Sequence, residues 1–207
     1  MLDLAFVLAL AQTCAPAVAP QTLAAVAYVE SRFDPFAIGV NRGGSKPPRQ
    51  ASAQQAVATA HQLLRDGANL DLGLAQINSD NLQWLGLTVE DAFDPCRSLA
   101  ASAEVLRAGY RPSGDSPDAR QAALRVALSR YNTGHPQRGF RNGYVRRVEA
   151  AAARLSLTLP SQAAAPSSSA PVHLVAQAPP PAWDIFARAR AAAPIAVSTN
   201  PIGSSPP

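Results

Sequence analysis

The sequence predicts a mainly α-helical domain over residues 1–160, followed by a disordered tail over residues 161–207. Two observations support this division. Apolar residues make up 47% of the chain, and in the first part they recur at helical spacing. From Ser161 onward the chain is mostly Ala, Pro and Ser without a sustained period, so it cannot bury enough apolar surface to offset chain entropy.

The first half of the domain is predicted to contain three helices and one extended segment. Helices are expected over Leu2–Thr13, Pro20–Arg32 and Gln54–Arg65. The Gly- and Pro-rich stretch Gly39–Pro48 is expected to be a loop. Residues 69–78 alternate partly between apolar and polar side chains, so this is where we expect short strands or a hairpin.

The second half is predicted to contain three further helices. Asp94 followed by Pro95 is a strong start signal, because Asp caps a helix and Pro suits its first position. The inner face of this helix would consist of Cys96, Leu99, Ala103, Leu106 and Tyr110. Another helix is expected from Ser116 and Pro117 to Gly134, and a last one over Tyr144–Leu155.

Charge and hydropathy narrow the classes of partner. The formal net charge of +4 suits an anionic surrounding such as a cell wall, a membrane surface or nucleic acid. The Arg residues are scattered and no basic run interleaves with aromatic residues, so we expect no nucleic-acid partner. No run of about 18 apolar residues occurs, so no transmembrane segment is predicted.

The N-terminal segment has two readings. Leu4–Ala11 is apolar and ends in an A-x-A pattern, which is typical of a secretory signal. However, Asp3 precedes it and no Lys or Arg does. We therefore favour a first core helix, which leaves the export route and the mature N-terminus open.

The chain has two cysteines, Cys14 and Cys96. Neither belongs to a CxxC or Cys/His pattern, so no metal site is predicted, and no cofactor motif is present. From spacing alone, a disulfide between two helices and a pair of buried free thiols are both open.

Glu30 occupies a position where a helix should be apolar. Leu23, Val26 and Ala27 form a stripe at i, i+3 and i+4, and Glu30 continues it at i+7. A carboxyl group on an inner face is either paired or kept neutral by a raised pKa. Burial would raise its pKa from about 4.3 toward about 6, as a general acid requires. The alternative is an ordinary ion pair with an arginine.

Two further stretches carry polar side chains suited to a cleft. In "GLAQIN" (Gly73–Asn78), Gln76 and Asn78 are two residues apart and would face one side of an extended segment. Their amides suit sugar hydroxyl and acetamido groups, although a polar strand edge would look the same. In "SRYNTG" (Ser129–Gly134), Tyr131 and Asn132 would present a phenol and an amide, unless the motif is simply a helix stop.

Taken together and in this order, Glu-Ser on an apolar helix, "GLAQIN" and "RYNTG" resemble the soluble lytic transglycosylase family of the lysozyme superfamily. The sequence is more closely similar to the small lytic transglycosylases encoded with type IV secretion and conjugation systems. The resemblance extends over residues 14–41, 69–78, 93–106 and 127–148, and covers roughly residues 5–157. It implies a lysozyme-like (goose-type) helical domain with a short β-hairpin.

The resemblance also implies a mechanism and a set of site residues. In this family one glutamate protonates the glycosidic oxygen between N-acetylmuramic acid and N-acetylglucosamine, then acts as base while the C6 hydroxyl closes onto C1. By motif match, Glu30 is the catalytic acid and base, and Ser31 orients it or supports the oxocarbenium-like state. Gln76 and Asn78 would line the saccharide subsites. Tyr131 and Asn132 would close the cleft.

The resemblance bears on three further positions. It implies that Cys14 and Cys96 form a disulfide. Ala75 replaces the methionine usual in the Gly-Leu-Met-Gln motif, so we expect a smaller contact in the cleft wall. Arg130 stands where many members have alanine. Neither departure removes a reacting group.

We therefore expect a peptidoglycan lytic transglycosylase of the periplasm or cell envelope that opens the wall for a secretion or conjugation apparatus. Its partners would be glycan strands and, through the tail, components of that apparatus; residues 181–192 are a candidate docking segment. Two alternatives stay open. One is a lysozyme-type muramidase that uses Asp71 as its second acid. The other is a non-catalytic wall-binding assembly subunit.

Overall fold

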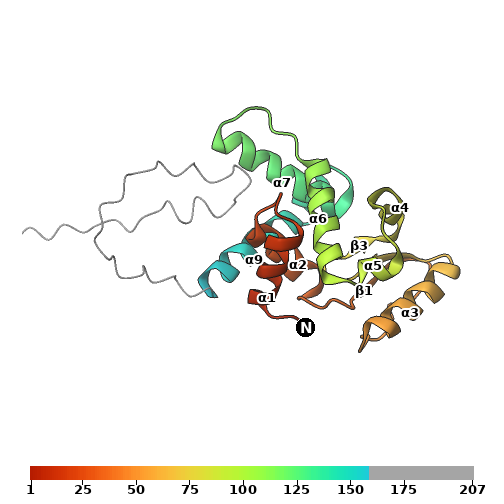
Figure 1. Cartoon of the computed structure of the whole chain (residues 1–207). Helices are drawn as coiled ribbons and strands as arrows, with labels where there is room; N and C mark the ends of the chain where they lie inside the picture. The colour runs from red at the N-terminus through yellow and green to blue at the C-terminus, as the bar shows by residue number, and fades with distance from the viewer. Residues whose placement is uncertain (159–207) are drawn as a thin grey trace, which may run out of the picture.

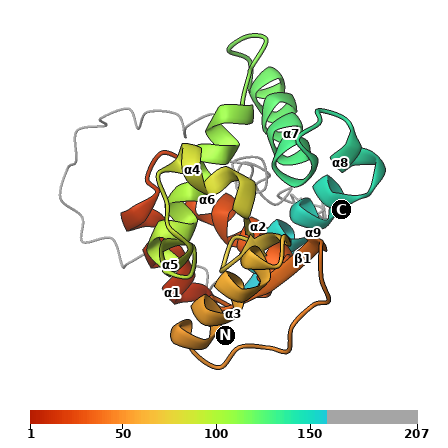
Figure 2. The same cartoon turned by 90° about the vertical axis from the view of Figure 1, so that its right-hand side faces the viewer.

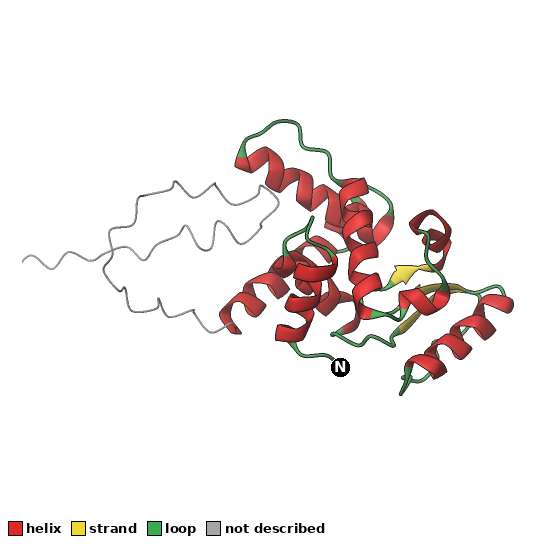
Figure 3. Cartoon of the chain, viewed as in Figure 1, coloured by secondary structure: helices red, strands yellow, loops and turns green. Residues whose placement is uncertain are grey.

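Helices make up most of residues 1–158, the part of the chain that the computed structural model describes (Figures 1 and 3). The elements are α1 (Leu4–Cys14), α2 (Pro20–Ser31), β1 (Ile38–Arg42), α3 (Ala53–Arg65), β2 (Asn69–Leu72), β3 (Ile77–Asn78), a 3-10 turn η1 (Ser79–Asn81), α4 (Leu82–Leu85), α5 (Val89–Ala92), α6 (Pro95–Gly109), α7 (Pro117–Thr133), α8 (Arg138–Arg141) and α9 (Tyr144–Thr158). The prediction of a mainly helical domain with a short hairpin is confirmed. The predicted tail and docking segment lie outside the described residues.

Side-chain caps explain where the long helices begin. The carboxylate of Asp94 accepts a hydrogen bond from the Arg97 backbone N–H at 2.8 Å, and Ser116 caps α7 in the same way through Ala119. Each cap satisfies an N–H group that has no partner within the helix. Both predicted starts are confirmed.

The sheet is antiparallel with the order β1-β2-β3. The predicted hairpin is formed by β2 and β3, but β1 falls partly within a stretch that we predicted as a loop. Its Gly39 and Asn41 are poor strand formers, and pairing with β2 overrides that preference. A Cβ at Gly39 would lie 2.9 Å from Oε1 of Gln76, so a larger residue there would displace the end of that side chain.

Two hydrophobic cores divide the described residues into two lobes. The helical lobe is built from α1, α2, α7, α9 and part of α6, around the fully buried Leu23, Val26 and Leu99. The sheet lobe packs α3 and α5 on the strands, around the fully buried Leu70 and Leu72. Figure 1 shows α6 between the two lobes, and in Figure 2 α7 and α8 lie together, away from α3.

A disulfide joins Cys14, the last residue of α1, to Cys96 in the first turn of α6, with the two Cα atoms 5.5 Å apart. The predicted pairing is confirmed, and it closes a loop of 82 residues. Within residues 1–158, no helix combines the length and apolar character needed to cross a membrane.

Candidate active site

A cleft of about 490 Å³ opens between the two lobes, which is a volume typical of ligand-binding sites. Its lining comes from both lobes and consists of Glu30, Asn41, Asn69, Asp71, Gln76, Ile77, Asn78, Asn81, Trp84, Val105, Ala108, Arg130, Tyr131, Asn132, Thr133 and Gly134. The structure thus brings together five of the six predicted site residues: Glu30, Gln76, Asn78, Tyr131 and Asn132.

Glu30 lies in the last turn of α2, on the stripe that the sequence periodicity indicated. Directly after it, α2 ends because Arg32 adopts the left-handed conformation with φ of 57°. The carboxylate is half-buried and accepts a hydrogen bond from the hydroxyl of Tyr144 at 2.5 Å. The hydrogen-bond partner is thus a phenol, and no salt bridge to Glu30 is found among the described residues, so the alternative of an ordinary arginine ion pair is not observed.

The surroundings of Glu30 make it a weak acid. Burial raises its pKa from 4.5 to about 7, and the negative charge of Asp71 acts in the same direction. The hydrogen bond from Tyr144 and the positive charge of Arg147 oppose that rise. A carboxyl group with such a pKa can both donate and accept a proton near neutral pH.

Tyr144, at the start of α9, was missed as a functional residue by the sequence analysis. Its side chain is fully buried, and burial together with the charge of Glu30 raises the phenol pKa well above its usual value. It therefore acts as a neutral donor. The sequence did carry a signal: Tyr144 is four residues before the buried Val148, so it lies on the inner face of the same helix. A phenol that is buried there needs a hydrogen-bond partner.

Tyr131 and Asn132 lie at the end of α7, where Gly134 with φ of 66° terminates the helix. The Tyr131 hydroxyl donates to the carbonyl of Ala75 at 2.6 Å, and this bond joins the helical lobe to the sheet lobe across the cleft. Asn132 accepts a hydrogen bond from Asn142 at 2.8 Å. Burial, and the charge of Glu30 after it, raise the pKa of Tyr131 far above its usual value.

Gln76 and Asn78 both line the cleft, but the extended geometry predicted for Gln76 is wrong. Gln76 lies in the turn between β2 and β3 with φ of 50°, in the left-handed region. Its side-chain amide donates to the carbonyls of Ala37 and Gly73 at 3.1 and 3.0 Å, which fixes the turn. These two hydrogen bonds offset the cost of the left-handed backbone at Gln76. The alternation of apolar and polar residues in the sequence could not indicate that backbone conformation.

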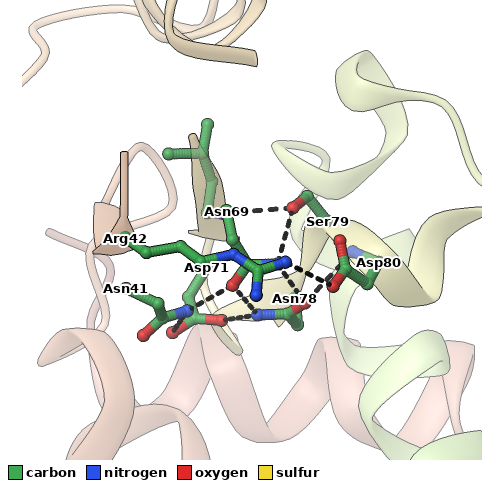
Figure 4. Close-up of polar contacts among 8 residues, drawn as sticks. Asn41, Arg42, Asn69, Asp71, Asn78, Ser79 and Asp80 are labelled. Atoms are coloured by element: carbon green, nitrogen blue, oxygen red, sulfur yellow. Dashed lines mark hydrogen bonds and ion pairs between the residues drawn. The ribbon is translucent and has the colours of Figure 1, made fainter. Parts of the chain in front are cut away.

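Asp71 belongs to a hydrogen-bonded network on the sheet side of the cleft (Figure 4). It accepts hydrogen bonds from the side-chain amides of Asn41 at 2.9 Å and Asn78 at 2.7 Å. Asn69 completes the network: its side-chain oxygen accepts from the amide of Asn41 at 3.0 Å, and its amide donates to the side-chain oxygen of Asn78 at 3.0 Å. The network presents several amides and one carboxylate on strands β1, β2 and β3.

Two predicted positions do not line the cleft. The Ser31 hydroxyl donates to the carbonyl of Leu74 at 2.6 Å, so it ties the end of α2 to the turn after β2. The side chain of Ala75 is fully buried, and its backbone N–H donates to Ser98. Ala75 contributes to the site through its carbonyl, whereas Arg130 lines the cleft directly.

Among the described residues, no cluster of His, Cys, Asp and Glu side chains has the composition of a metal site. The cleft instead combines one carboxyl group with a raised pKa, the neutral phenol of Tyr131 and a wall of amides, and the buried phenol of Tyr144 is hydrogen-bonded to that carboxyl group. This arrangement can transfer a proton to a ligand that is rich in hydroxyl and amide groups.

Comparison with known proteins matches this chain to the transglycosylase SLT domain family over residues 8–153. The chain is 49% identical over 145 residues to Protein virB1 of Agrobacterium fabrum, which covers 70% of this chain and 58% of that protein. It is 50% identical over 146 residues to Protein virB1 of Rhizobium radiobacter, with shares of 70% and 60%. It is 44% identical over 151 residues to the type IV secretion system protein virB1 of Brucella abortus, with shares of 70% and 63%.

The chain thus spans about three fifths of the length of these relatives, with 58% covered in one and 63% in another. No solved structure is matched at a significant level.

Proposed function

Because the chain belongs to the transglycosylase SLT domain family, we propose that it is a peptidoglycan lytic transglycosylase. Its reaction would cleave the β-1,4 bond between N-acetylmuramic acid and N-acetylglucosamine and leave a 1,6-anhydromuramic end. The observation that carries the proposal is the environment of Glu30: half-buried in a cleft, hydrogen-bonded by Tyr144, with a pKa of about 7.

In the proposed reaction Glu30 enters protonated and gives its proton to the glycosidic oxygen, so that the C1–O bond breaks. The resulting carboxylate then takes the proton of the muramyl C6 hydroxyl while that oxygen bonds to C1. The proton is returned, and no water is consumed. A pKa of about 7 serves both half-reactions, since neither protonation state is strongly disfavoured near neutral pH.

The remaining cleft residues would hold the glycan. Asn132, whose oxygen accepts from Asn142, would offer its amide N–H groups to the acetamido and hydroxyl groups of the sugars. The amide N–H groups of Gln76 and Asn78 are already bonded within the sheet lobe, so these two side chains would form a fixed polar wall of the saccharide subsites. Tyr131 and Ser31 would act by holding the lobes in register through their bonds to Ala75 and Leu74. In this assignment Ser31 positions the helix end that carries Glu30.

The hydrolase alternative keeps one supporting observation, because Asp71 lines the same cleft as Glu30. A hydrolase would use that carboxylate to activate water or to attack C1. Here its two oxygens accept hydrogen bonds from Asn41 and Asn78. The single-acid reaction needs no second carboxylate and is therefore our first choice.

The biological setting is proposed from the relatives. Three of them carry the name virB1, and one is named as a protein of a type IV secretion system. We propose that this chain acts in the periplasm, where it opens peptidoglycan locally for such an apparatus. The contact between residues 161–207 and components of that apparatus is a proposal from sequence alone.

The test is digestion of purified murein with the full chain, followed by mass spectrometry of the released products. We expect anhydromuropeptides, and a loss of at least about a hundredfold in their release on Glu30→Gln, because that change removes the proton donor. Glu104→Gln is the matched control, since Glu104 is half-exposed and pairs with Arg107 outside the cleft. Reducing ends would indicate a hydrolase, and no release at all would favour a binding subunit.

A further inference from the structure

The cleft contains one large aromatic side chain that the proposed reaction does not use. Trp84, on α4, lines the cleft and is 53% exposed. Other exposed large apolar side chains among the described residues, such as Phe6 and Phe140, lie outside the cleft lining. A half-exposed indole in a concave, largely polar site indicates a binding surface, because leaving it in water is unfavourable.

The indole is held in place by the fold. Its Nε1–H donates to Oδ1 of Asn81 at 3.0 Å, and Asn81 also lines the cleft. Leu82, in the same helix, is buried in the core of the sheet lobe. Gly86 ends the helix in the left-handed conformation with φ of 65°. The ring therefore loses little conformational freedom when a ligand covers it.

Trp84 and Glu30 occupy different parts of the same cleft. Glu30 is half-buried at the end of α2 in the helical lobe. Trp84 is exposed and belongs to α4, a helix that packs on the sheet lobe through Leu82. Figure 1 shows α4 near β3, on the other side of α6 from α1. The two side chains therefore contact a bound ligand from opposite lobes of the cleft.

We propose that Trp84 forms a distal sugar subsite, in which the face of the indole stacks on the C–H face of an N-acetylhexosamine ring. The inference rests on the proposed function for the kind of ligand, a β-1,4-linked glycan. A pyranose ring has one apolar C–H face and a polar rim, which matches an aromatic side chain in a cleft that the amides of Asn78 and Asn81 also line. The subsite makes the cleft favour long strands over short ones.

The test is a fluorescence titration of the full chain with chitohexaose and chitobiose. The chain has two tryptophans, so Trp183→Phe leaves Trp84 as the only indole, and Glu30→Gln prevents turnover. We expect chitohexaose to change the Trp84 emission with saturation, and chitobiose to bind more weakly. In the Glu30→Gln background, Trp84→Ala should weaken chitohexaose binding on the order of tenfold by calorimetry, with Trp84→Phe in between.

Phe140→Ala is the matched control, because Phe140 is exposed on α8 outside the cleft lining, and its affinity should equal that of the parent. Thermal melting checks that the Trp84 variants fold. The inference is overturned if the Trp84→Ala variant binds chitohexaose as tightly as its parent. It is also overturned if the parent binds without any change in emission, or does not bind at all. Failure of the proposed function has a different signature: murein digestion without anhydro products, while the Trp84 titration still saturates.

Discussion

Each wall of the cleft carries one carboxyl group, and the side chains that surround these two groups differ. On the helical wall, Glu30 sits at the end of a buried helix and receives one hydrogen bond, from the phenol of Tyr144. On the sheet wall, Asp71 receives two hydrogen bonds from the amides of Asn41 and Asn78. Both acids line the same cleft.

The difference teaches how one cleft assigns different tasks to similar groups. Apolar packing around Glu30 penalises the charged form, which is why its pKa rises to about 7. Around Asp71, by contrast, the side-chain amides of Asn41 and Asn78 donate one hydrogen bond to each carboxylate oxygen. A helix packed on helices provides the first environment, and adjacent strands bearing asparagines provide the second. The charge of Asp71 in turn helps Glu30 to keep its proton.

The largest expected effect concerns the helical wall and is a pH dependence of the free energy of unfolding. Glu30 has a pKa of about 7 in the folded chain and about 4.5 in the unfolded one. Between these values the folded chain holds a proton that the unfolded chain releases, so stability should fall as pH rises, by up to about 3 kcal/mol. Glu30→Gln should remove this fall. Urea unfolding at pH 4 and pH 8 measures this fall. An equal fall in the free energy of unfolding of the parent and of the Glu30→Gln variant would contradict the comparison.

The next effect concerns the phenol. Tyr144→Phe removes a hydrogen bond that lowers the pKa of Glu30, so that pKa should rise above about 7. The alkaline limb of the pH–rate profile should move to higher pH. Activity should drop about tenfold, since the carboxylate formed in the reaction loses a bond of about 1.5 kcal/mol. Tyr28→Phe is the control and should change neither quantity, because Tyr28 lies on α2 with Glu30 but outside the cleft lining.

The smallest effect comes from the sheet wall and has the opposite sign. Asp71→Asn removes a negative charge that raises the pKa of Glu30, so the alkaline limb should move to lower pH. Because Asp71 is not a reacting group in the proposed mechanism, activity at the optimum should fall less than tenfold. A loss as large as that of Glu30→Gln would instead identify Asp71 as a hydrolase partner. Asp80→Asn, which removes an exposed ion pair with Arg42, is the control.

Much of the helical wall could be predicted from the sequence. The i, i+3, i+4 stripe places Glu30 on an inner face, and the Asp-Pro and Ser-Pro signals locate the starts of α6 and α7. These features are local, so a single segment carries all the information. The helix end at Gly134, which presents Tyr131 and Asn132, is local in the same way.

The sheet wall was less accessible to sequence reasoning, because its geometry depends on pairing between distant segments. β1 is held by β2, and its own residues do not favour a strand. The left-handed Gln76 is fixed by bonds to Ala37 and Gly73. Tyr144 was missed for a related reason: its partner Glu30 is 114 residues away, and no pattern within either helix links the two.

The Cys14–Cys96 bond makes the strength of the fold depend on the redox state of the compartment. Closing a loop of 82 residues contributes about 4 kcal/mol in the chain-entropy account, which is a large part of the 5–15 kcal/mol that holds a typical domain together. In reducing surroundings both thiols would be free and α1 would lose its covalent tie to α6. Reduction would therefore lower the free energy of unfolding of the lobe that holds Glu30 in place.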